Sequence, residues 1–466
     1  MKTIRDWRGI AALAAGGLVL AAVIAVAVVG VHVLGIATAF YAKTLCSGIF
    51  VSERPEASII AGDILPKLKR LPDRFSYRID PEGSTVSVAY LGLARREAVF
   101  RPGLGCTLLI GASRGDLLAR RPGLPPVPAS DALPVSPLAG EAGARMEAVL
   151  DRAFAEPEGR GARRTRAVVI LHAGQVVAER YAEGISADTP LAGWSMSKTV
   201  TGALIGVLVS EGKLSLESSA LFPEWKSPGD SRATVTVAQL LRMTSGLDFG
   251  SNEGALVSPV QEMLFGTGDA ASIPLAAPLA GAPGTAWRYG SGSTLLLCRL
   301  IRQTLGGDAA LAFAREAVFA PLGMASAVLE PDASGTPLGA AFLYAAARDW
   351  ARFGQFLLQD GVWKGRRILP ENWVAFATQA TARSGEAYGA HLWRRTPAFL
   401  RPEGARDFDL PGDRSLMLGV DGQMVAIVPS RELVVVRLGM STGRAAFDPD
   451  EFLAGVLAAL SGERVN

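Results

Sequence analysis

The chain has 466 residues, a formal net charge of +3 and 20% charged residues. This length allows more than one folded unit, and this charge balance gives no indication of a nucleic acid or another strongly charged partner. Hydrophobic residues make up 49% of the chain, and part of that apolar content is concentrated at the N-terminus.

The N-terminal segment has the features of a membrane anchor. No charged residue occurs between Arg8 and Lys43, and residues 10–36 are almost wholly apolar. About 20 apolar residues cross a bilayer, whereas the apolar core of a secretory signal has about 7–15, so an uncleaved anchor is favoured. Three basic residues precede the run and predict an N-terminus in the cytoplasm. We expect a cytoplasmic tail at 1–9, a transmembrane helix at 10–39, and a single-pass protein whose main domain is periplasmic or extracellular.

A small membrane-proximal module is predicted at residues 40–117. Residues 63–71 have helical spacing, and residues 84–90 alternate as a β-strand does. Cys46 and Cys106 lie near its two ends, and in an oxidising compartment they could form a disulfide. The stretch 118–139 is rich in proline and without periodicity, which is typical of a linker.

The main domain is expected at residues 140–466. Two strand-like runs, 166–171 and 175–181, are joined by an Ala-Gly turn, and a second antiparallel pair, 424–428 and 433–438, precedes a terminal helix. Helical patterns fill the region between. Strands at both ends of the domain predict one antiparallel sheet whose first and last strands come together, beside a helical cluster. The fold class is therefore α+β.

A serine and a lysine open the helix that follows the first strand pair. Ser195 and Lys198 are three residues apart and thus share one helix face, near the positive end of the helix dipole. A neutral lysine amine there could take the serine proton, and the alkoxide could attack a carbonyl. Ser210 and Lys213 have the same spacing, but they close the helix near Gly212 and lack that dipole support. Taken alone, the pair is more typical of an ordinary helix start with a surface lysine.

Two further stretches supply polar groups at element boundaries. Tyr289 and Ser291 lie where a Gly/Pro-containing loop becomes a helix, which can aim a phenol and a hydroxyl into a cleft. Taken alone, a core or surface tyrosine would be the simpler interpretation. Later, Gly419, Val420 and Asp421 stand at the entry to a strand.

With these motifs in order, the chain resembles the serine β-lactamase and penicillin-recognising family. It is most similar to the class C-like branch of esterases, D-peptidases and 6-aminohexanoate-dimer hydrolases. The supporting stretches 240–247, 321–324, 347–354 and 427–436 extend the resemblance over residues 166–460. It implies the β-lactamase/DD-peptidase-like α/β sandwich, an antiparallel sheet flanked by helices with a helical subdomain.

The resemblance also implies roles. Ser195 would be the nucleophile, Lys198 its base, and Tyr289 the group that protonates the leaving group. Ser291 would take the place of the family's asparagine or serine. The oxyanion hole would be the backbone N–H groups of Ser195 and Val420. Further candidates for substrate contact or for lining the cleft are Asp421 (alternatively a tight-turn residue), Gln423, Trp287, Trp194, Tyr388 and Trp393.

One departure from the family pattern narrows the range of expected substrates. The third motif is usually Lys-Thr-Gly or His-Thr-Gly, and here the matching place reads Met417-Leu418-Gly419. The cation that would bind a substrate carboxylate is absent. An amide or ester held by apolar contacts is therefore favoured over a β-lactam or a D-Ala-D-Ala peptide.

We predict a serine hydrolase, an amidase or esterase of small-molecule substrates, that forms an acyl-enzyme on Ser195. A catalytically weak penicillin-recognising sensor, and a D-amino-acid peptidase or β-lactamase, stay as alternatives. A Ser-His-Asp hydrolase is disfavoured because only His172 and His391 lie outside the N-terminal apolar run. The sequence has no Cys/His spacing typical of a metal site and no glycine-rich phosphate loop, so no cofactor, metal or nucleic-acid partner is predicted.

Overall fold

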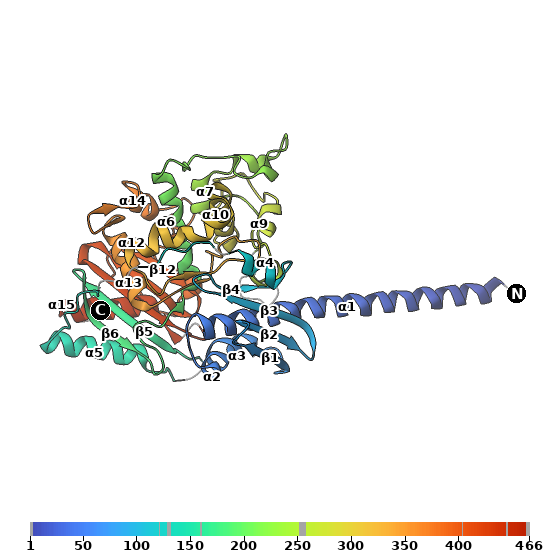
Figure 1. Cartoon of the computed structure of the whole chain (residues 1–466), viewed down its shortest axis with the longest axis horizontal. Helices are drawn as coiled ribbons and strands as arrows, with labels where there is room; N and C mark the ends of the chain where they lie inside the picture. Colours follow the sequence, from blue (N-terminus) through green and yellow to red (C-terminus); the bar gives the residue numbers. More distant parts are fainter. Residues whose placement is uncertain are drawn as a thin grey trace.

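The computed structural model describes residues 3–120, 122–127, 132–158, 161–250, 258–402, 404–443 and 446–462, without side chains for 3–12, 16 and 19–27. The body is a sheet-and-helix domain from which one long N-terminal helix projects (Figure 1).

Helix α1 (Thr3–Phe50) is continuous and has two different environments. Its N-terminal part stands clear of the body, with Val28 and Val31 exposed. Within the described residues, the segment Val28–Phe50 is long and apolar enough to cross a membrane, but 56% of its most apolar window is buried inside the protein. From Gly35 onward the helix is embedded, and Ile36 is 1% exposed. The sequence-based anchor boundary at residue 39 therefore falls inside the folded body.

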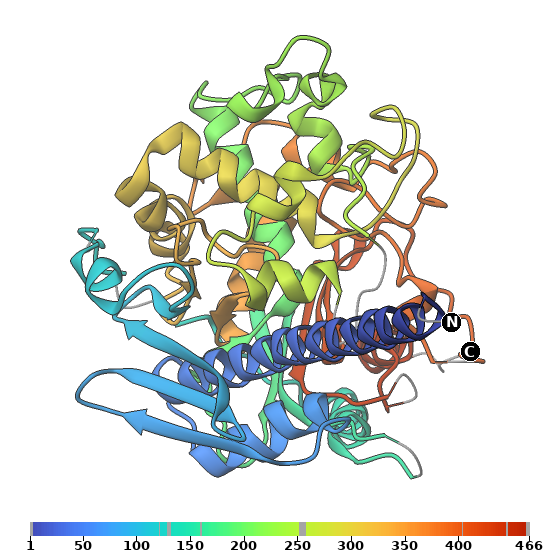
Figure 2. The ribbon, with the colours of Figure 1, turned by 90° about the vertical axis from the view of Figure 1, so that its right-hand side faces the viewer.

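The embedded half of α1 belongs to the membrane-proximal module. It packs on a four-stranded antiparallel sheet of order β1-β2-β3-β4 (Figure 2). Cys46 of α1 and Cys106 of β4 form a disulfide with Cα atoms 6.1 Å apart. The helix expected at 63–71 begins earlier, at Glu56, and includes a π-helical turn. The elements are α2 (Glu56–Ile59), η1 (Ile60–Ile64), α3 (Leu65–Leu68), β1 (Phe75–Asp80), β2 (Thr85–Tyr90), β3 (Leu93–Arg101), β4 (Gly105–Leu108) and α4 (Arg114–Ala119).

A buried ion pair joins this module to the main domain. Lys43 Nζ of α1 lies 2.6 Å from Glu330 Oε2 of the main domain, and the two side chains are 1% and 0% exposed. Ser47 Oγ and the backbone N–H of Cys106 donate to the other carboxylate oxygen. The Lys43 ammonium also donates to the carbonyl of Cys106 and lies 4.4 Å from the ring centroid of Phe342. These contacts offset part of the cost of burying two charges.

The segment expected to be a linker ends on the main sheet. Val135 forms a parallel bridge with Val176, and the N–H groups of Ser136 and Leu138 donate to strand β6. It thereby covers an edge that would otherwise expose unpaired backbone groups.

The central sheet has five antiparallel strands in the order β12-β13-β14-β5-β6. Strand β14 pairs with β5, which confirms the prediction that the ends of the domain meet. Ala173 and Gly174 both have positive φ, 49° and 75°, as a tight hairpin turn requires. The strands are β5 (Thr165–His172), β6 (Gln175–Tyr181), β12 (Ser415–Gly419), β13 (Gln423–Val428) and β14 (Leu433–Gly439).

Helices cover both faces of this sheet. Helices α5 (Gly140–Phe154) and α15 (Pro449–Ser461) pack with Val168 and Ile170 on one face. The intervening Val169 and Leu171 point the other way, into the larger core shared with α13 (Ala347–Leu358). This alternation is the period-two pattern of a strand buried on both faces.

The helical region lies between β6 and β12 in sequence. Thr236 and Gln239 form the predicted capping box at the start of α7. The elements are β7 (Leu191–Ala192), η2 (Trp194–Met196), α6 (Ser197–Ser210), η3 (Pro223–Trp225), η4 (Ser231–Thr234), α7 (Val237–Leu241), α8 (Pro259–Gln261), η5 (Glu262–Gly266), α9 (Ser272–Ala276), α10 (Ser291–Leu305), α11 (Gly307–Ala314), η6 (Arg315–Phe319), α12 (Ala320–Leu322), β8 (Val328–Leu329), β9 (Leu343–Ala345), β10 (Val362–Trp363), β11 (Arg366–Arg367), α14 (Trp373–Thr378) and η7 (Ala398–Leu400).

Candidate active site

Ser195 lies in a tight turn between β7 and α6. The turn is 3₁₀-helical, so the serine precedes the α-helix proper by half a turn. Trp194 before it has φ of +48°, a left-handed conformation that is strained for a bulky residue. Ser197 Oγ donates to the carbonyl of Trp194 at 2.6 Å and accepts from the N–H of Leu343 at 3.3 Å. These bonds fix the turn that presents the serine.

Lys198 connects the candidate catalytic groups. Its Nζ lies 2.9 Å from Ser195 Oγ, 3.4 Å from Ser291 Oγ and 3.0 Å from the carbonyl oxygen of Ala340. The same nitrogen is 5.2 Å from the ring centroid of Tyr289. The side chain is buried. Residues that are distant in the sequence therefore converge on one amine.

The three polar contacts suit both protonation states of that amine. A neutral amine has two N–H donors and one lone pair, enough to donate to Ala340 and Ser291 while accepting the Ser195 hydroxyl proton. An ammonium has three donors for the same three oxygens. A proton can thus pass from Ser195 to Lys198 without moving a heavy atom, which is what a general base requires.

Tyr289 is held by an aromatic cluster. Its ring centroid lies 5.0 Å from that of Trp393 and 5.8 Å from that of Tyr388, and Trp287 packs on the same two rings at 6.1 and 5.6 Å. Tyr388 and Trp393 are buried. These two residues support Tyr289 from behind, whereas Trp194 lines the cavity that contains Ser195.

That cavity has a volume of about 340 Å³, within the range of small-molecule sites. Ser195, Ser291 and Val420 all line it. Strand β12 brings Val420 there, because Gly419 lies so close to the turn that contains Ser195 that a Cβ would sit 2.5 Å from the carbonyl oxygen of Gly193. Val420 therefore lines the same cavity as Ser195, and the oxyanion-hole role of its backbone N–H stays a prediction.

The other residues proposed near Val420 have different environments. Asp421 and Gly422 have φ of 65° and 79°, in the turn η8 (Val420–Gly422). The Asp421 carboxylate is paired with Lys67 of α3. Gln423 is buried, and its amide bonds both the N–H and the carbonyl of Gly439, so its side chain fastens β13 to β14.

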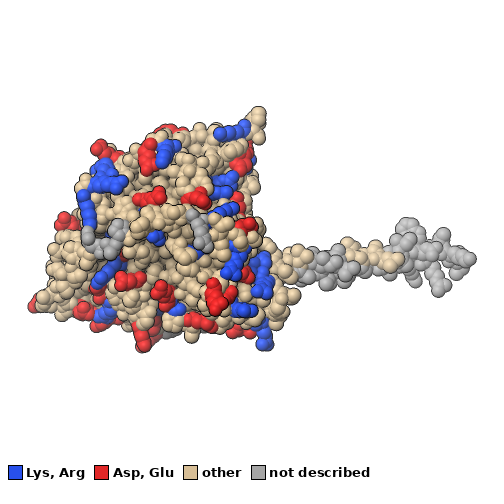
Figure 3. Space-filling model, in the orientation of Figure 1, with Lys and Arg blue, Asp and Glu red and all other residues tan. Residues whose placement is uncertain are grey.

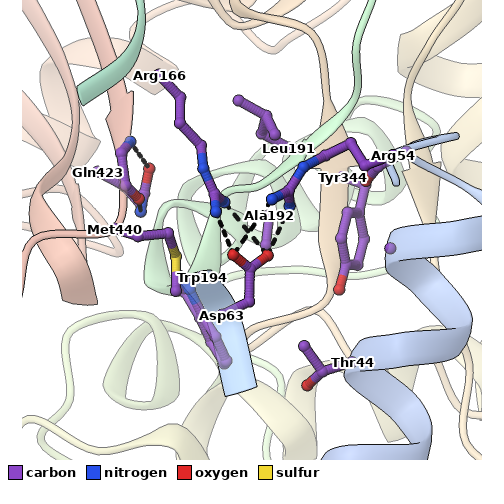
Figure 4. Close-up of a pocket in the computed structure, with 13 residues that line it drawn as sticks. Thr44, Arg54, Asp63, Arg166, Leu191, Ala192, Trp194, Tyr344, Gln423 and Met440 are labelled. Carbon is purple, nitrogen blue, oxygen red and sulfur yellow. Dashed lines mark hydrogen bonds and ion pairs between the residues drawn. The ribbon is translucent and has the colours of Figure 1, made fainter. Parts of the chain in front are cut away.

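A second charged cluster lies behind Trp194 (Figure 4). Asp63 accepts from Arg54 at 2.6 Å and pairs with Arg166 of β5. Burial acts to raise the pKa of Asp63, but the two guanidinium groups lower it overall. Together with Trp194 these side chains line a small cavity of about 20 Å³. Side chains of the membrane-proximal module and of the main domain therefore lie around the same small cavity as Trp194.

His391 is not available as a catalytic base. Its Nδ1 lies 2.7 Å from the carbonyl oxygen of Leu241, which can only accept, so Nδ1 carries the proton and Nε2 accepts from Thr294 Oγ1 at 2.8 Å. Burial lowers its pKa to about 3, which keeps the ring neutral. His172 lies at the end of β5, in the hairpin opposite Gln175.

Sequence reasoning did not identify part of the site. The carbonyl of Ala340 is a backbone group, which no side-chain motif marks. Ile36 and Phe40 of α1 and the segment 66–71 also line the cavity. The apolar run containing Ile36 indicated a membrane span instead, and nothing in the spacing joined it to Ser195.

A buried lysine within hydrogen-bonding distance of a serine that lines a cavity, beside an antiparallel sheet, fits the class of serine hydrolases. The match to known families is consistent with that class. Residues 150–460 match the Beta-lactamase family, and the chain belongs to it.

Individual relatives were found by sequence and by structure. The 6-aminohexanoate-dimer hydrolase of Paenarthrobacter ureafaciens is 25% identical over 289 residues, 59% of this chain and 72% of that protein. A Bacillus anthracis structure with a provisional description as a 6-aminohexanoate-dimer hydrolase has 21% identity and a TM-score of 0.57, over 73% of this chain and 89% of the other. A penicillin-binding protein homologue from Caulobacter crescentus has 20% identity and a TM-score of 0.52, over 70% and 99%. The two structures establish the shared fold.

Proposed function

We propose that this protein is an amidase or esterase that acts through an acyl-enzyme on Ser195. The observation that carries the proposal is the set of contacts made by Lys198, which links Ser195, Ser291 and Ala340 through one buried nitrogen. A purely structural role for Lys198 would not explain why a strained turn holds the Ser195 hydroxyl 2.9 Å from its amine.

The reaction begins with transfer of the Ser195 proton to Lys198 as the serine oxygen bonds to the substrate carbonyl carbon. The N–H groups of Ser195 and Val420 stabilise the resulting oxyanion. Collapse of the tetrahedral intermediate breaks the bond to the amine or alcohol, which leaves with a proton from the Tyr289 hydroxyl. The proton held by Lys198 then passes to the Tyr289 oxygen and restores the hydroxyl. Water then hydrolyses the ester on Ser195 and releases the acid.

The substrate proposed is a small amide or ester without a required carboxylate. The third motif carries no cation, and Lys67, which lies beside it, is already paired with Asp421. The Paenarthrobacter relative is named for hydrolysis of a 6-aminohexanoate dimer, which supports a small-molecule hydrolysis reaction here by analogy.

The test uses the full chain in detergent micelles with p-nitrophenyl esters, linear amide oligomers and nitrocefin. We expect turnover of an ester or amide that falls by at least about 10³-fold in Ser195→Ala. Ser210→Ala is the matched control, since Ser210 is the serine of the second Ser-x-x-Lys pair, exposed at the other end of α6. Absence of Ser195-dependent turnover on every substrate would leave the catalytically weak penicillin-recognising sensor as the better account.

We further propose that α1 anchors the protein as a single-pass membrane helix with the main domain outside the cytoplasm. The exposed apolar part of α1 and the Cys46–Cys106 disulfide, a bond typical of oxidising compartments, support this. An anchored protein stays in the membrane pellet after an alkaline carbonate wash, and release into the supernatant would contradict the anchor.

A further inference from the structure

The cavity that contains Ser195 is lined by the main domain and by the N-terminal part of the chain. Its floor comes from the main domain, through Ser195 and the turn η5. One wall comes from α1, where Ile36 and Phe40 are one helical turn apart. The helix that leaves the body is therefore also a wall of the catalytic cavity.

This wall is apolar and firmly packed. Phe40 meets Phe265 of η5 edge to face, with ring centroids 5.5 Å apart, and Phe265 packs in the same way on Phe342. Leu264 and Leu68 extend the apolar surface, and all of these side chains are largely buried. A hydrocarbon chain that enters this cavity leaves water, and the removal of its apolar area from water is favourable.

The cavity also lies close to where α1 would leave a bilayer. Val31 is exposed, and the helix is embedded from Gly35 onward. At 1.5 Å per residue, Ile36 is about 7 Å along the helix axis from Val31, comparable with the thickness of one headgroup layer. His32, between them, bonds Glu262 of η5 at 2.8 Å and so fixes the exit of α1 beside the cavity.

The outer rim of the cavity is basic. Lys69 and Arg70 line it and are exposed, and both basic and acidic side chains are visible at the edge of the body from which α1 emerges (Figure 3). Cations at this depth favour contact with the anionic surface of a membrane. Apolar wall, basic rim and anchor helix together orient the cavity toward the lipid interface.

We infer that the substrate is a membrane amphiphile whose acyl chain, joined by an ester or amide bond, lies in the cavity against Ile36 and Phe40. The carbonyl then meets Ser195, and the chain enters from the headgroup layer along α1. This inference rests on the proposed hydrolase function and names the substrate class of that site.

The experiment measures kcat/KM for p-nitrophenyl acetate, butyrate, octanoate and decanoate with the full chain in lipid nanodiscs. Each methylene that becomes buried is expected to raise kcat/KM about fourfold until the cavity is full. Ile36→Trp and Phe40→Trp fill the cavity and should lower the octanoate-to-acetate ratio at least about tenfold. Leu93→Trp is the control, because Leu93 is exposed on β3 of the same module and lies outside the cavity lining. Leu264→Trp blocks the same space from η5 should the α1 variants fail to fold.

The outcomes separate the two proposals. Two results would overturn the proposal of an amphiphilic substrate and leave the hydrolase proposal intact. One is Ser195-dependent turnover that is as fast or faster for the acetate ester than for the octanoate ester. The other is a preference for octanoate that all three cavity variants retain. No Ser195-dependent turnover of any ester would defeat the hydrolase and the amphiphile together. A palmitoyl ester placed in the enzyme's own vesicle should be cleaved faster than one in separate vesicles, and equal rates would contradict entry from the membrane.

Discussion

Removal of the Glu330 charge tests whether α1 is an integral part of the fold. In Glu330→Gln, Lys43 loses its counter-ion while it stays buried among Phe342 and the carbonyl of Cys106. Breaking a buried pair by removal of one partner costs about 3–5 kcal/mol. Burial already lowers the pKa of Lys43 from its ordinary value of 10.5, so the lone amine would release its proton.

This loss of the Lys43 proton sets an upper limit to the free energy of unfolding that Glu330→Gln can cost. At pH 7, deprotonation of a group with an ordinary pKa of 10.5 costs about 5 kcal/mol, at about 1.4 kcal/mol per unit. Because the folded variant holds a neutral lysine and the unfolded chain a charged one, the free energy of unfolding rises with pH. Between pH 7 and pH 8.5 the variant should regain about 2 kcal/mol relative to wild type.

The assay is urea unfolding of the full chain in detergent, followed by tryptophan fluorescence at both pH values. Asp360→Asn is the control, since it breaks the exposed pair of Asp360 with Arg367 and should cost less than about 1 kcal/mol. The double variant Lys43→Met with Glu330→Gln should recover part of the loss because no buried charge remains. A loss below about 1 kcal/mol for Glu330→Gln, without pH dependence, would refute the reasoning.

Three further predictions follow from the site and its surroundings. Lys198→Arg should abolish turnover while the fold survives, because a guanidinium cannot act as a base; retained activity in the ester assay would remove the lysine from the mechanism. Burial lowers the pKa of His391 to about 3 in the folded protein, whereas the unfolded chain has the ordinary histidine pKa. The free energy of unfolding should therefore fall as the pH drops below about 6.5, by about 2 kcal/mol at pH 5. A His391→Gln variant whose free energy of unfolding falls with pH as steeply as that of the wild type would contradict this. Non-reducing peptide mapping of exported protein should find Cys46 joined to Cys106, and their replacement by serine should cost about 4 kcal/mol for a loop with a sequence separation of 60; two free thiols would exclude the bond.

Much of the main domain could be predicted from periodicity. The strands β5, β6, β13 and β14 lie within one or two residues of the predicted runs, because alternating branched residues and turn signals such as Ala173-Gly174 act locally. The resemblance supplied the order of the motifs. The three-residue spacing already indicated that Lys198 lies near Ser195, but its contacts with Ser291 and Ala340 needed the fold, since spacing says nothing of distance between segments.

The membrane-proximal region was harder to predict for a physical reason. A helix apolar on all sides fits a bilayer and a protein core equally well, so residues 35–39 could not be assigned to one or the other. In the sequence, Lys43 has the position of a polar residue at the end of a transmembrane span. In the structure it is buried against Glu330, a residue almost three hundred positions away. Long-range compensation of this kind leaves no local signal.

The acyl-enzyme on Ser195 is tested most directly by reaction with a fluorophosphonate, followed by peptide mass spectrometry. The account predicts one phosphonyl adduct on the peptide that contains Ser195 and none in Ser195→Ala, with Ser210→Ala labelled as wild type is. An unlabelled wild-type protein, or an adduct on another serine, would contradict it.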